Sequence, residues 1–127
     1  MRGAPRAPRL PEDHLATNMA TSVLYSDAGW DGTRALIGGE GPKWVRSVYA
    51  HSETADRYFQ VFDAAAVADV TLGTTEPIIN IPLENVDDNV QLRFDGAKFQ
   101  LGIVVAATTD SRGSTAGGTV NYTIEVA

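Results

Sequence analysis

Apolar residues in this 127-residue chain come in short runs, and turn-forming residues separate each run from the next. From Ser22 onward, no segment repeats its apolar residues at the 3.6-residue period of a long helix. Short runs with frequent turn signals are typical of β-strands joined by tight connections. The chain is therefore expected to fold as an all-β protein.

Seven to eight segments are candidate strands, and several of them alternate between apolar and polar residues. They are Ser22–Tyr25, Thr33–Ile37, Lys43–Ala50, Arg57–Asp63, Pro77–Leu83, Val90–Phe94, Lys98–Thr109 and Thr119–Val126. So many strands within about 105 residues predict an antiparallel β-sandwich of the jelly-roll type or a related Greek-key type. In such a sandwich each sheet buries its apolar face against the other.

Three clusters of turn-forming residues are expected to end strands. Asp95-Gly96 is a strong hairpin signal and predicts that the runs on either side of it pair with each other. Ser26–Gly29 and Gly38–Pro42 are also rich in turn-forming residues. Each of these two clusters is expected to close the strand that precedes it.

Other segments are informative about burial. Ile103–Ala107 is continuously apolar, which predicts a strand covered on both faces. Gly102 precedes that stretch and indicates a bulge or a close approach of another backbone. The two prolines of Pro77–Leu83 cannot donate to a sheet ladder, so this run is expected to be an edge strand or to have the side of its missing donor facing outward. The segment 64–76 is interpreted as a surface loop.

The two tryptophans are expected in different environments. Regular alternation in Lys43–Ala50 would place Trp44 on the same face as Val48, and Trp44 is interpreted as a core residue. Trp30 stands in a glycine-rich turn beside Asp31, where exposure at the surface or at an interface is expected. Flat aromatic rings also stack on sugars, so a carbohydrate-binding face stays as an alternative.

Composition limits the chain to one folded domain without cysteine chemistry. A chain of 127 residues and 13.5 kDa, 43% of it hydrophobic, supports one hydrophobic core. It has no cysteine, which excludes a disulfide scaffold, a thiolate metal site and a cysteine nucleophile. No apolar run approaches the ~18 residues that would span a membrane. We therefore expect a sandwich domain over residues 21–127 with no membrane partner.

Charge divides the chain into a basic leader and an acidic body. Residues 1–9 contain three arginines and no acid, a charge of +3. Residues 10–127 contain 7 basic and 16 acidic residues, a charge of −9. A body of this sign repels phosphate, so direct binding to nucleic acid is not expected.

Prolines at every third position shape the N-terminal segment. Pro5, Pro8 and Pro11 exclude a helix up to that point and favour an extended arm, here taken as residues 1–20. Such a segment has too few apolar groups to fold alone, so a neighbouring surface would have to order it. A solvated leader is the alternative. The predicted partner-binding residues are Arg2, Arg6, Arg9, Leu10 and Trp30.

No catalytic, metal or cofactor site is predicted. The two histidines, His14 and His51, lack the clustering that zinc requires, and His51 is interpreted as a polar loop residue. Glu84–Asn89 offers several oxygens to a cation such as calcium but lacks the spacing of a known calcium loop, and a solvated acidic turn is the alternative. No Gly-x-Ser-x-Gly elbow occurs. We expect a protein that is not an enzyme.

Three stretches of the chain form a pattern longer than any single strand. They are Tyr58–Asp63 with the alanines that follow, Pro77–Leu83, and the run from Phe99 through Gly102 to Thr109. This pattern resembles a recurrent segment in small structural proteins of tailed bacteriophages. The resemblance covers about residues 44–126 and carries no catalytic residues. It implies a β-sandwich module of the virion, of the kind found among head-decorating and tail-associated proteins.

The resemblance, the all-β pattern and the basic arm together favour a bacteriophage structural protein located in the virion. A capsid decoration (cement) protein is expected first, binding and stabilising the shell of major capsid protein on the capsid surface. We expect a homo-oligomer, with a trimer as one form. The alternative is a tail or baseplate module with an adhesion or carbohydrate-binding role.

Overall fold

The computed structural model describes residues 22–54, 56–110, 115–117 and 119–127, and within these ranges the chain is almost entirely β-structure. The expected arm over residues 1–20, with Arg2, Arg6, Arg9 and Leu10, lies outside the described residues. The elements are β1 (Val23–Trp30), β2 (Ala35–Glu40), β3 (Lys43–Ser52), β4 (Arg57–Asp63), the short 3-10 helix η2 (Val67–Asp69), β5 (Ile79–Leu83), β6 (Asn89–Phe99), β7 (Gly102–Thr108) and β8 (Val120–Val126). The all-β fold is confirmed.

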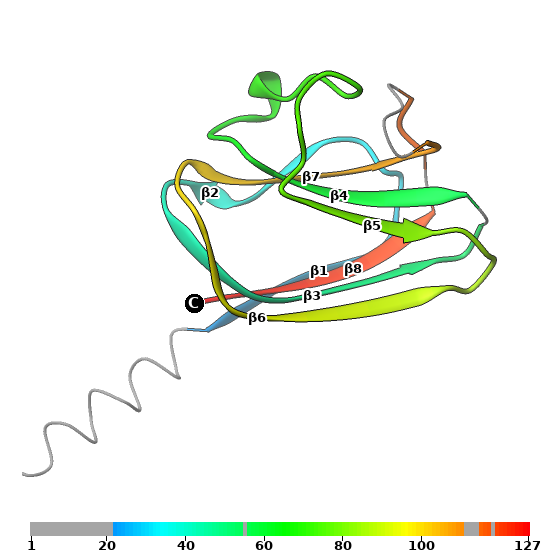
Figure 1. The fold of residues 1–127 in the computed structure, drawn as a ribbon, viewed down its shortest axis with the longest axis horizontal. Coiled ribbons are helices and arrows are strands. Elements are labelled where there is room, and N and C mark those ends of the chain that lie inside the picture. The colour runs from blue at the N-terminus through cyan, green and yellow to red at the C-terminus, as the bar shows by residue number, and fades with distance from the viewer. Residues whose placement is uncertain (1–21, 55, 111–114, 118) are drawn as a thin grey trace, which may run out of the picture.

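The strands form two four-stranded antiparallel sheets stacked on each other (Figure 1). One sheet has the order β1-β8-β3-β6 and the other the order β2-β7-β4-β5. The pairs β1–β8, β2–β7, β3–β6 and β4–β5 nest inside one another along the chain, as in one long hairpin wrapped into two layers. This connectivity is that of a jelly roll. The antiparallel sandwich is confirmed, and so is the edge position expected for the run that contains β5.

The core lies between the sheets and is filled by alternate residues of the strands. In β8 the residues Val120, Tyr122, Ile124 and Val126 are buried, which confirms the alternation expected there. Trp30, Phe59 and Tyr122 form an aromatic cluster at the centre of this core. Burial raises the pKa of the Tyr122 hydroxyl above its ordinary value, and the charge of Asp27 adds to this effect.

The expectation that Trp30 is exposed is wrong, because only 7% of its surface is accessible. Ser26–Gly29 does not end the first strand. Instead β1 continues to Trp30 with a shift in its pairing to β8 between Asp27 and Trp30, and Gly29 adopts a φ of +70° within this bulge. The bulge turns the Trp30 side chain inward, where the residue pairs with Val120.

The outer face of the sheet containing β7 has a small core of its own. All of β7 is buried, which confirms the strand expected to be covered on both faces. The cover is the segment 64–76, whose residues Ala64 and Val70 pack on Phe62 and Val104. The segment is a loop, as expected, but it is partly buried because it closes this face. Gly102 is the close approach that was expected, since an added Cβ would lie 2.7 Å from the Ala64 carbonyl oxygen.

The hairpin expected at Asp95-Gly96 is wrong. β6 runs unbroken from Asn89 to Phe99, and the connection to β7 lies at Gln100 and Leu101. Val45 of β3 pairs with Ala97 of β6, and Ser47 pairs with Arg93. β6 therefore has two more residues than β3 between these pairs, and Asp95-Gly96 lies in the resulting bulge. Gly96 has a φ of +90°, the conformation that a hairpin turn would also have used.

The interpretation of Trp44 as a core residue is also wrong. β3 contains a bulge between Val45 and Ser47, so Val45 and Val48 both face the core although they are three residues apart. Trp44 and Arg46 are therefore on the solvent side, and 47% of the Trp44 surface is accessible. A single extra residue in a strand reverses the face of every residue on one side of it.

Asp63 closes the connection between β6 and β7. Its two carboxylate oxygens accept hydrogen bonds from the backbone N–H groups of Gln100, at 3.0 Å, and Leu101, at 2.8 Å. Asp63→Ala is expected to lower the free energy of unfolding by about 2 kcal/mol, because two backbone donors lose a charged acceptor. Urea denaturation measures this, with Asp69→Ala on the exposed face of η2 as the control. Equal effects of the two variants would contradict the role of Asp63.

Candidate binding surface

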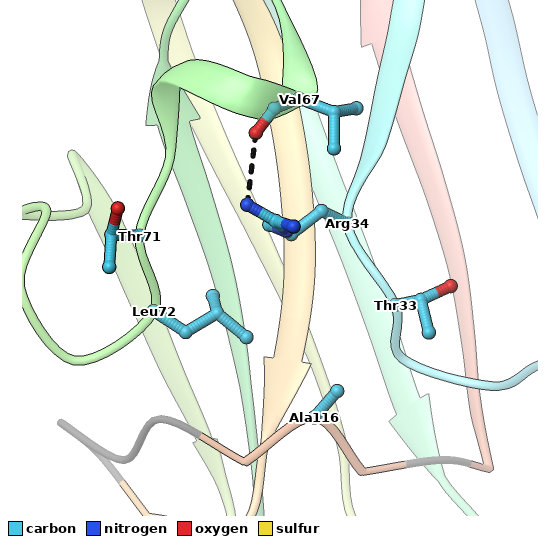
Figure 2. A pocket seen from close by; sticks show the side chains of 6 residues that line it. All are labelled: Thr33, Arg34, Val67, Thr71, Leu72 and Ala116. Carbon is cyan, nitrogen blue, oxygen red and sulfur yellow. Dashed lines mark hydrogen bonds between the residues drawn. The ribbon is translucent and has the colours of Figure 1, made fainter.

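The two sheets differ in what covers their outer faces. We call the sheet β2-β7-β4-β5 the covered sheet, because the segment 64–76 packs on it. Arg34 holds that segment in place: its guanidinium donates to the Val67 carbonyl oxygen at 3.2 Å (Figure 2). It also donates to the Val70 carbonyl oxygen. A hollow of about 490 Å³ lies beside this contact, lined also by Thr33, Thr71, Leu72 and Ala116. Because the Arg34 guanidinium already donates to these backbone carbonyls, its role here is to fix the segment 64–76 on the sheet.

We call the sheet β1-β8-β3-β6 the open sheet. Among the outward-facing residues whose burial the structure describes on these four strands, none is buried, in contrast to Phe62, Val104 and Ala106 on the covered sheet. Most of the outward residues are small or uncharged polar residues around one tyrosine. Away from Trp44, Arg46 and Lys98 at one end, the outward residues include Leu24 and Ser26 on β1, Asn121, Thr123 and Glu125 on β8, Ser47, Tyr49 and His51 on β3, and Asn89, Gln91 and Arg93 on β6.

An aromatic and basic hollow lies at one end of the open sheet. It has a volume of about 410 Å³ and is lined by Trp44, Arg46, Phe94, Gly96 and Ala127; we call it the Trp44 hollow. The Lys98 ammonium lies 5.4 Å from the centroid of the Trp44 ring, within the range of a cation–π contact. Gly96 lets the backbone pack against this ring, since an added Cβ would lie 3.1 Å from it.

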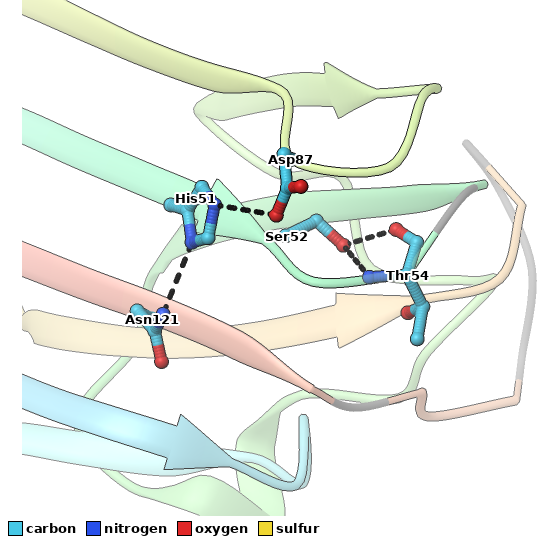
Figure 3. Close-up of polar contacts among 5 residues, drawn as sticks. All are labelled: His51, Ser52, Thr54, Asp87 and Asn121. Atoms are coloured by element: carbon cyan, nitrogen blue, oxygen red, sulfur yellow. Dashed lines mark hydrogen bonds and ion pairs between the residues drawn. The ribbon is translucent and has the colours of Figure 1, made fainter.

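A polar network occupies the opposite end of the open sheet (Figure 3). The Oδ1 of Asn121 accepts from the Gly29 N–H, so the Nδ2 of Asn121 faces His51 and donates to its Nδ1 at 3.1 Å. The Nε2 of His51 therefore carries the ring proton, and it lies 3.4 Å from the Asp87 carboxylate. His51 is thus a strand residue held at both ring nitrogens, and its interpretation as a loop residue is wrong.

This network lacks the geometry of a nucleophilic site. The neighbouring hydroxyl, Ser52 Oγ, belongs to a fully buried side chain and donates to the Thr54 carbonyl oxygen. Nucleophilic catalysis needs a hydroxyl within reach of a base with a free ring nitrogen. Both ring nitrogens of His51 already have partners. The arrangement can fix the positions of β3, β8 and the loop before β6, which is a structural role.

The predicted partner-binding residues are not brought together by the structure. Trp30 is in the core, and the arginines of the arm with Leu10 lie outside the described residues. The exposed aromatic that sequence reasoning missed is Trp44. A signal present in the sequence was Arg46, because regular alternation places this cation on the same face as Trp44 and a buried face tolerates a charge poorly.

The described residues show neither a metal cluster nor a helix that could span a membrane. Over the ranges that it describes, no group of three or more histidine, aspartate or glutamate side chains could hold a metal ion. Among the same residues, no helix is long and apolar enough to cross a bilayer. The comparisons with known proteins found no matching family model, no matching curated protein and no matching solved structure. Interpretation of function therefore rests on the jelly roll and on the surface of the open sheet.

Proposed function

We propose that this chain is a structural protein of a tailed-bacteriophage virion and acts as a capsid decoration (cement) protein. In this role it binds the outside of the major capsid protein shell in many copies and stabilises it, without catalysing a reaction. The partners are capsid or other virion proteins and further copies of the chain, with a trimer as one form of the oligomer. Neither nucleic acid nor a membrane is a partner in this proposal.

The observation that carries the proposal is a packed jelly roll with one sheet left open. Jelly rolls are one of the folds from which viral capsid proteins are built. Because one fold serves many functions, the surface must add to the argument. The core between the sheets is filled by side chains, and the open sheet presents a broad outward face of unburied residues. A rigid module with such a face suits attachment by shape, and many weak contacts on a shell add up through multivalency.

The experiment is to measure where the protein lies in intact particles and in how many copies. A decoration protein is expected on the capsid surface in hundreds of copies, because a shell repeats its binding site. Removing residues 1–20 is expected to lower capsid occupancy while the melting temperature of the sandwich stays unchanged, because strands from Val23 onward form both sheets and the core between them. Full occupancy without the arm would contradict its role, and a copy number of a few dozen would contradict the decoration role.

A tail or baseplate module with an adhesion role is the second candidate. Trp44 favours it, because an exposed aromatic ring beside a hollow offers a stacking surface for a sugar. A glycan array compares the unchanged protein with Trp44→Ala. Loss of binding in this variant would support adhesion. Trp30→Ala is unsuitable for the same test, since Trp30 lies in the core.

A further inference from the structure

The two ends of the open sheet carry opposite charge. β3 and β6 lie side by side and antiparallel, so Trp44 faces Lys98 at one end and His51 faces Asn89 at the other. At about 3.3 Å per residue, these ends are on the order of 20 Å apart. The strand pair therefore acts as a rigid spacer between two different surfaces.

One of these surfaces is basic and aromatic. Lys98 is exposed and its ammonium lies over the Trp44 ring, and the exposed Arg46 lines the same hollow. Arg93 is exposed further along β6. The Trp44 hollow, at about 410 Å³, falls within the size range of sites that enclose a side chain or a small ligand. Glu125 is the acidic group on the neighbouring strand β8, where it accepts a hydrogen bond from Ser47.

The other surface is acidic, and we call it the acidic end. It consists of Glu53, Thr54, Asp56 and the loop residues 84–88, none of which is a lysine or an arginine. Its five carboxylates are those of Glu53, Asp56, Glu84, Asp87 and Asp88. Arg57 follows directly at the start of β4 and donates to the Asp56 carbonyl oxygen.

The acidic end is held in shape by backbone hydrogen bonds between its two loops. Ser52 N–H donates to the Asp88 carbonyl oxygen at 3.0 Å, and Asp87 N–H donates to that of Ser52 at 2.9 Å. Asp56 N–H donates to the Glu84 carbonyl oxygen at 3.2 Å. Val86 projects from this platform with 60% of its surface accessible. The acidic end therefore presents an apolar side chain among carboxylates.

We propose that the Trp44 hollow binds the acidic end of a second copy of this chain. Val86 of that copy contacts the Trp44 ring, and its surrounding carboxylates face Arg46 and Lys98. An apolar side chain among carboxylates matches an aromatic ring among cations in both shape and charge. This inference does not depend on the virion role, because both surfaces belong to the chain itself.

The contact joins two different surfaces, so it is heterologous. Each copy keeps one surface of each kind free, and repetition of the contact gives a closed ring or an open filament. The formal net charge of −6 makes whole copies repel one another, which a local match of charges must overcome. The association is therefore expected to depend on these few residues and on ionic strength.

Two charge-reversal variants test the proposal in the full chain. The first, Arg46→Glu with Lys98→Glu, alters only the Trp44 hollow. The second, Glu53→Lys with Glu84→Lys, alters only the acidic end and spares Asp87 and Asp88, which make side-chain contacts. A matched control, Asp69→Lys with Asp110→Lys, changes the net charge as the second variant does but at exposed positions outside both surfaces. Circular dichroism and melting temperature show that each variant is folded.

Sedimentation velocity over a protein concentration series gives the readout. The unchanged chain and the control are expected to self-associate, and each charge-reversal variant is expected to be monomeric alone. An equimolar mixture of the two variants is expected to form a mixed complex, because each retains the surface that the other lacks. Trp44→Ala is expected to weaken self-association about 30-fold, as for a central aromatic residue of an interface.

Three results would overturn the proposal. The first is a chain that stays monomeric at both about 0.1 M and about 1 M salt, where the Debye length is about 10 Å and about 3 Å. The second is self-association that both charge-reversal variants retain. The third is a chain that is a monomer and whose Trp44 hollow binds a glycan or an acidic peptide instead of a second copy.

Discussion

Replacing Trp30 by alanine is expected to lower the free energy of unfolding by about 3–5 kcal/mol. The Trp30 ring meets those of Phe59, at 5.9 Å between centroids, and Tyr122, at 5.1 Å, both edge to face. Truncation removes these contacts and leaves a cavity between the two sheets, where the chain has little room to collapse. The loss is a large part of the ~5–15 kcal/mol by which a domain is usually stable.

Urea denaturation followed by circular dichroism measures this effect, and Trp44→Ala is its matched control. Trp44 is 47% exposed and makes one cation–π contact with Lys98, so its loss is expected to cost no more than about 1 kcal/mol. The sequence pattern alone favoured the opposite order, with Trp44 in the core and Trp30 exposed. Equal costs, or a larger cost at Trp44, would show that Trp30 is not the central residue of the core.

Gly32→Ala is expected to destabilise the fold by about 3 kcal/mol or more. An added Cβ would lie 2.2 Å from the carbonyl oxygen of Gly117, and the Gly32 φ of +85° is a conformation that alanine rarely adopts. The Gly32 carbonyl oxygen also accepts a hydrogen bond from the Ala107 N–H. The Ala107 carbonyl oxygen in turn accepts a hydrogen bond from the Gly117 N–H. Neither backbone can move away without breaking the hydrogen bonds that join this corner to β7.

Gly39→Ala separates the two causes. Gly39 has a nearly equal φ of +79°, but nothing lies within 4 Å of the position of an added Cβ. Its substitution is therefore expected to cost only the backbone strain, about 1 kcal/mol. The difference in unfolding free energy between the two variants measures the steric clash. Indistinguishable values would mean that the corner around Gly117 relaxes freely.

The open sheet connects the two proposals of function. Attachment to a shell uses a broad face, whereas the contact between copies uses only the two ends of the same sheet. The middle of the sheet, around Tyr49 and Thr123, stays available when copies associate end to end. Substitutions at the ends and in the middle can therefore separate self-association from binding to a capsid.

Much of the fold could be predicted from local patterns. The alternation in Thr119–Val126, the apolar stretch Ile103–Ala107 and the prolines of Pro77–Leu83 placed three strands and their burial correctly. Each of these signals depends on side-chain period or on a missing donor, which neighbours in sequence determine. The glycine at position 102 likewise indicated the close backbone approach that the structure contains.

The errors share one physical origin. At Asp27–Gly29 and Asp95-Gly96, the sequence signal was a residue able to adopt positive φ, which both a turn and a bulge require. The choice between them depends on whether a neighbouring strand continues to pair on both sides. That neighbour is β8 in the first case and β3 in the second, and both are distant in sequence.

Local sequence therefore determined the fold class, the number of strands and most of their apolar faces, because strand periodicity is a property of adjacent residues. Only the tertiary structure decided which tryptophan is buried and where the exposed aromatic and acidic surfaces lie. A bulge shifts every later side chain to the opposite face, and whether it forms depends on the pairing of strands far apart in the chain. The Trp44 hollow lies beside such a bulge.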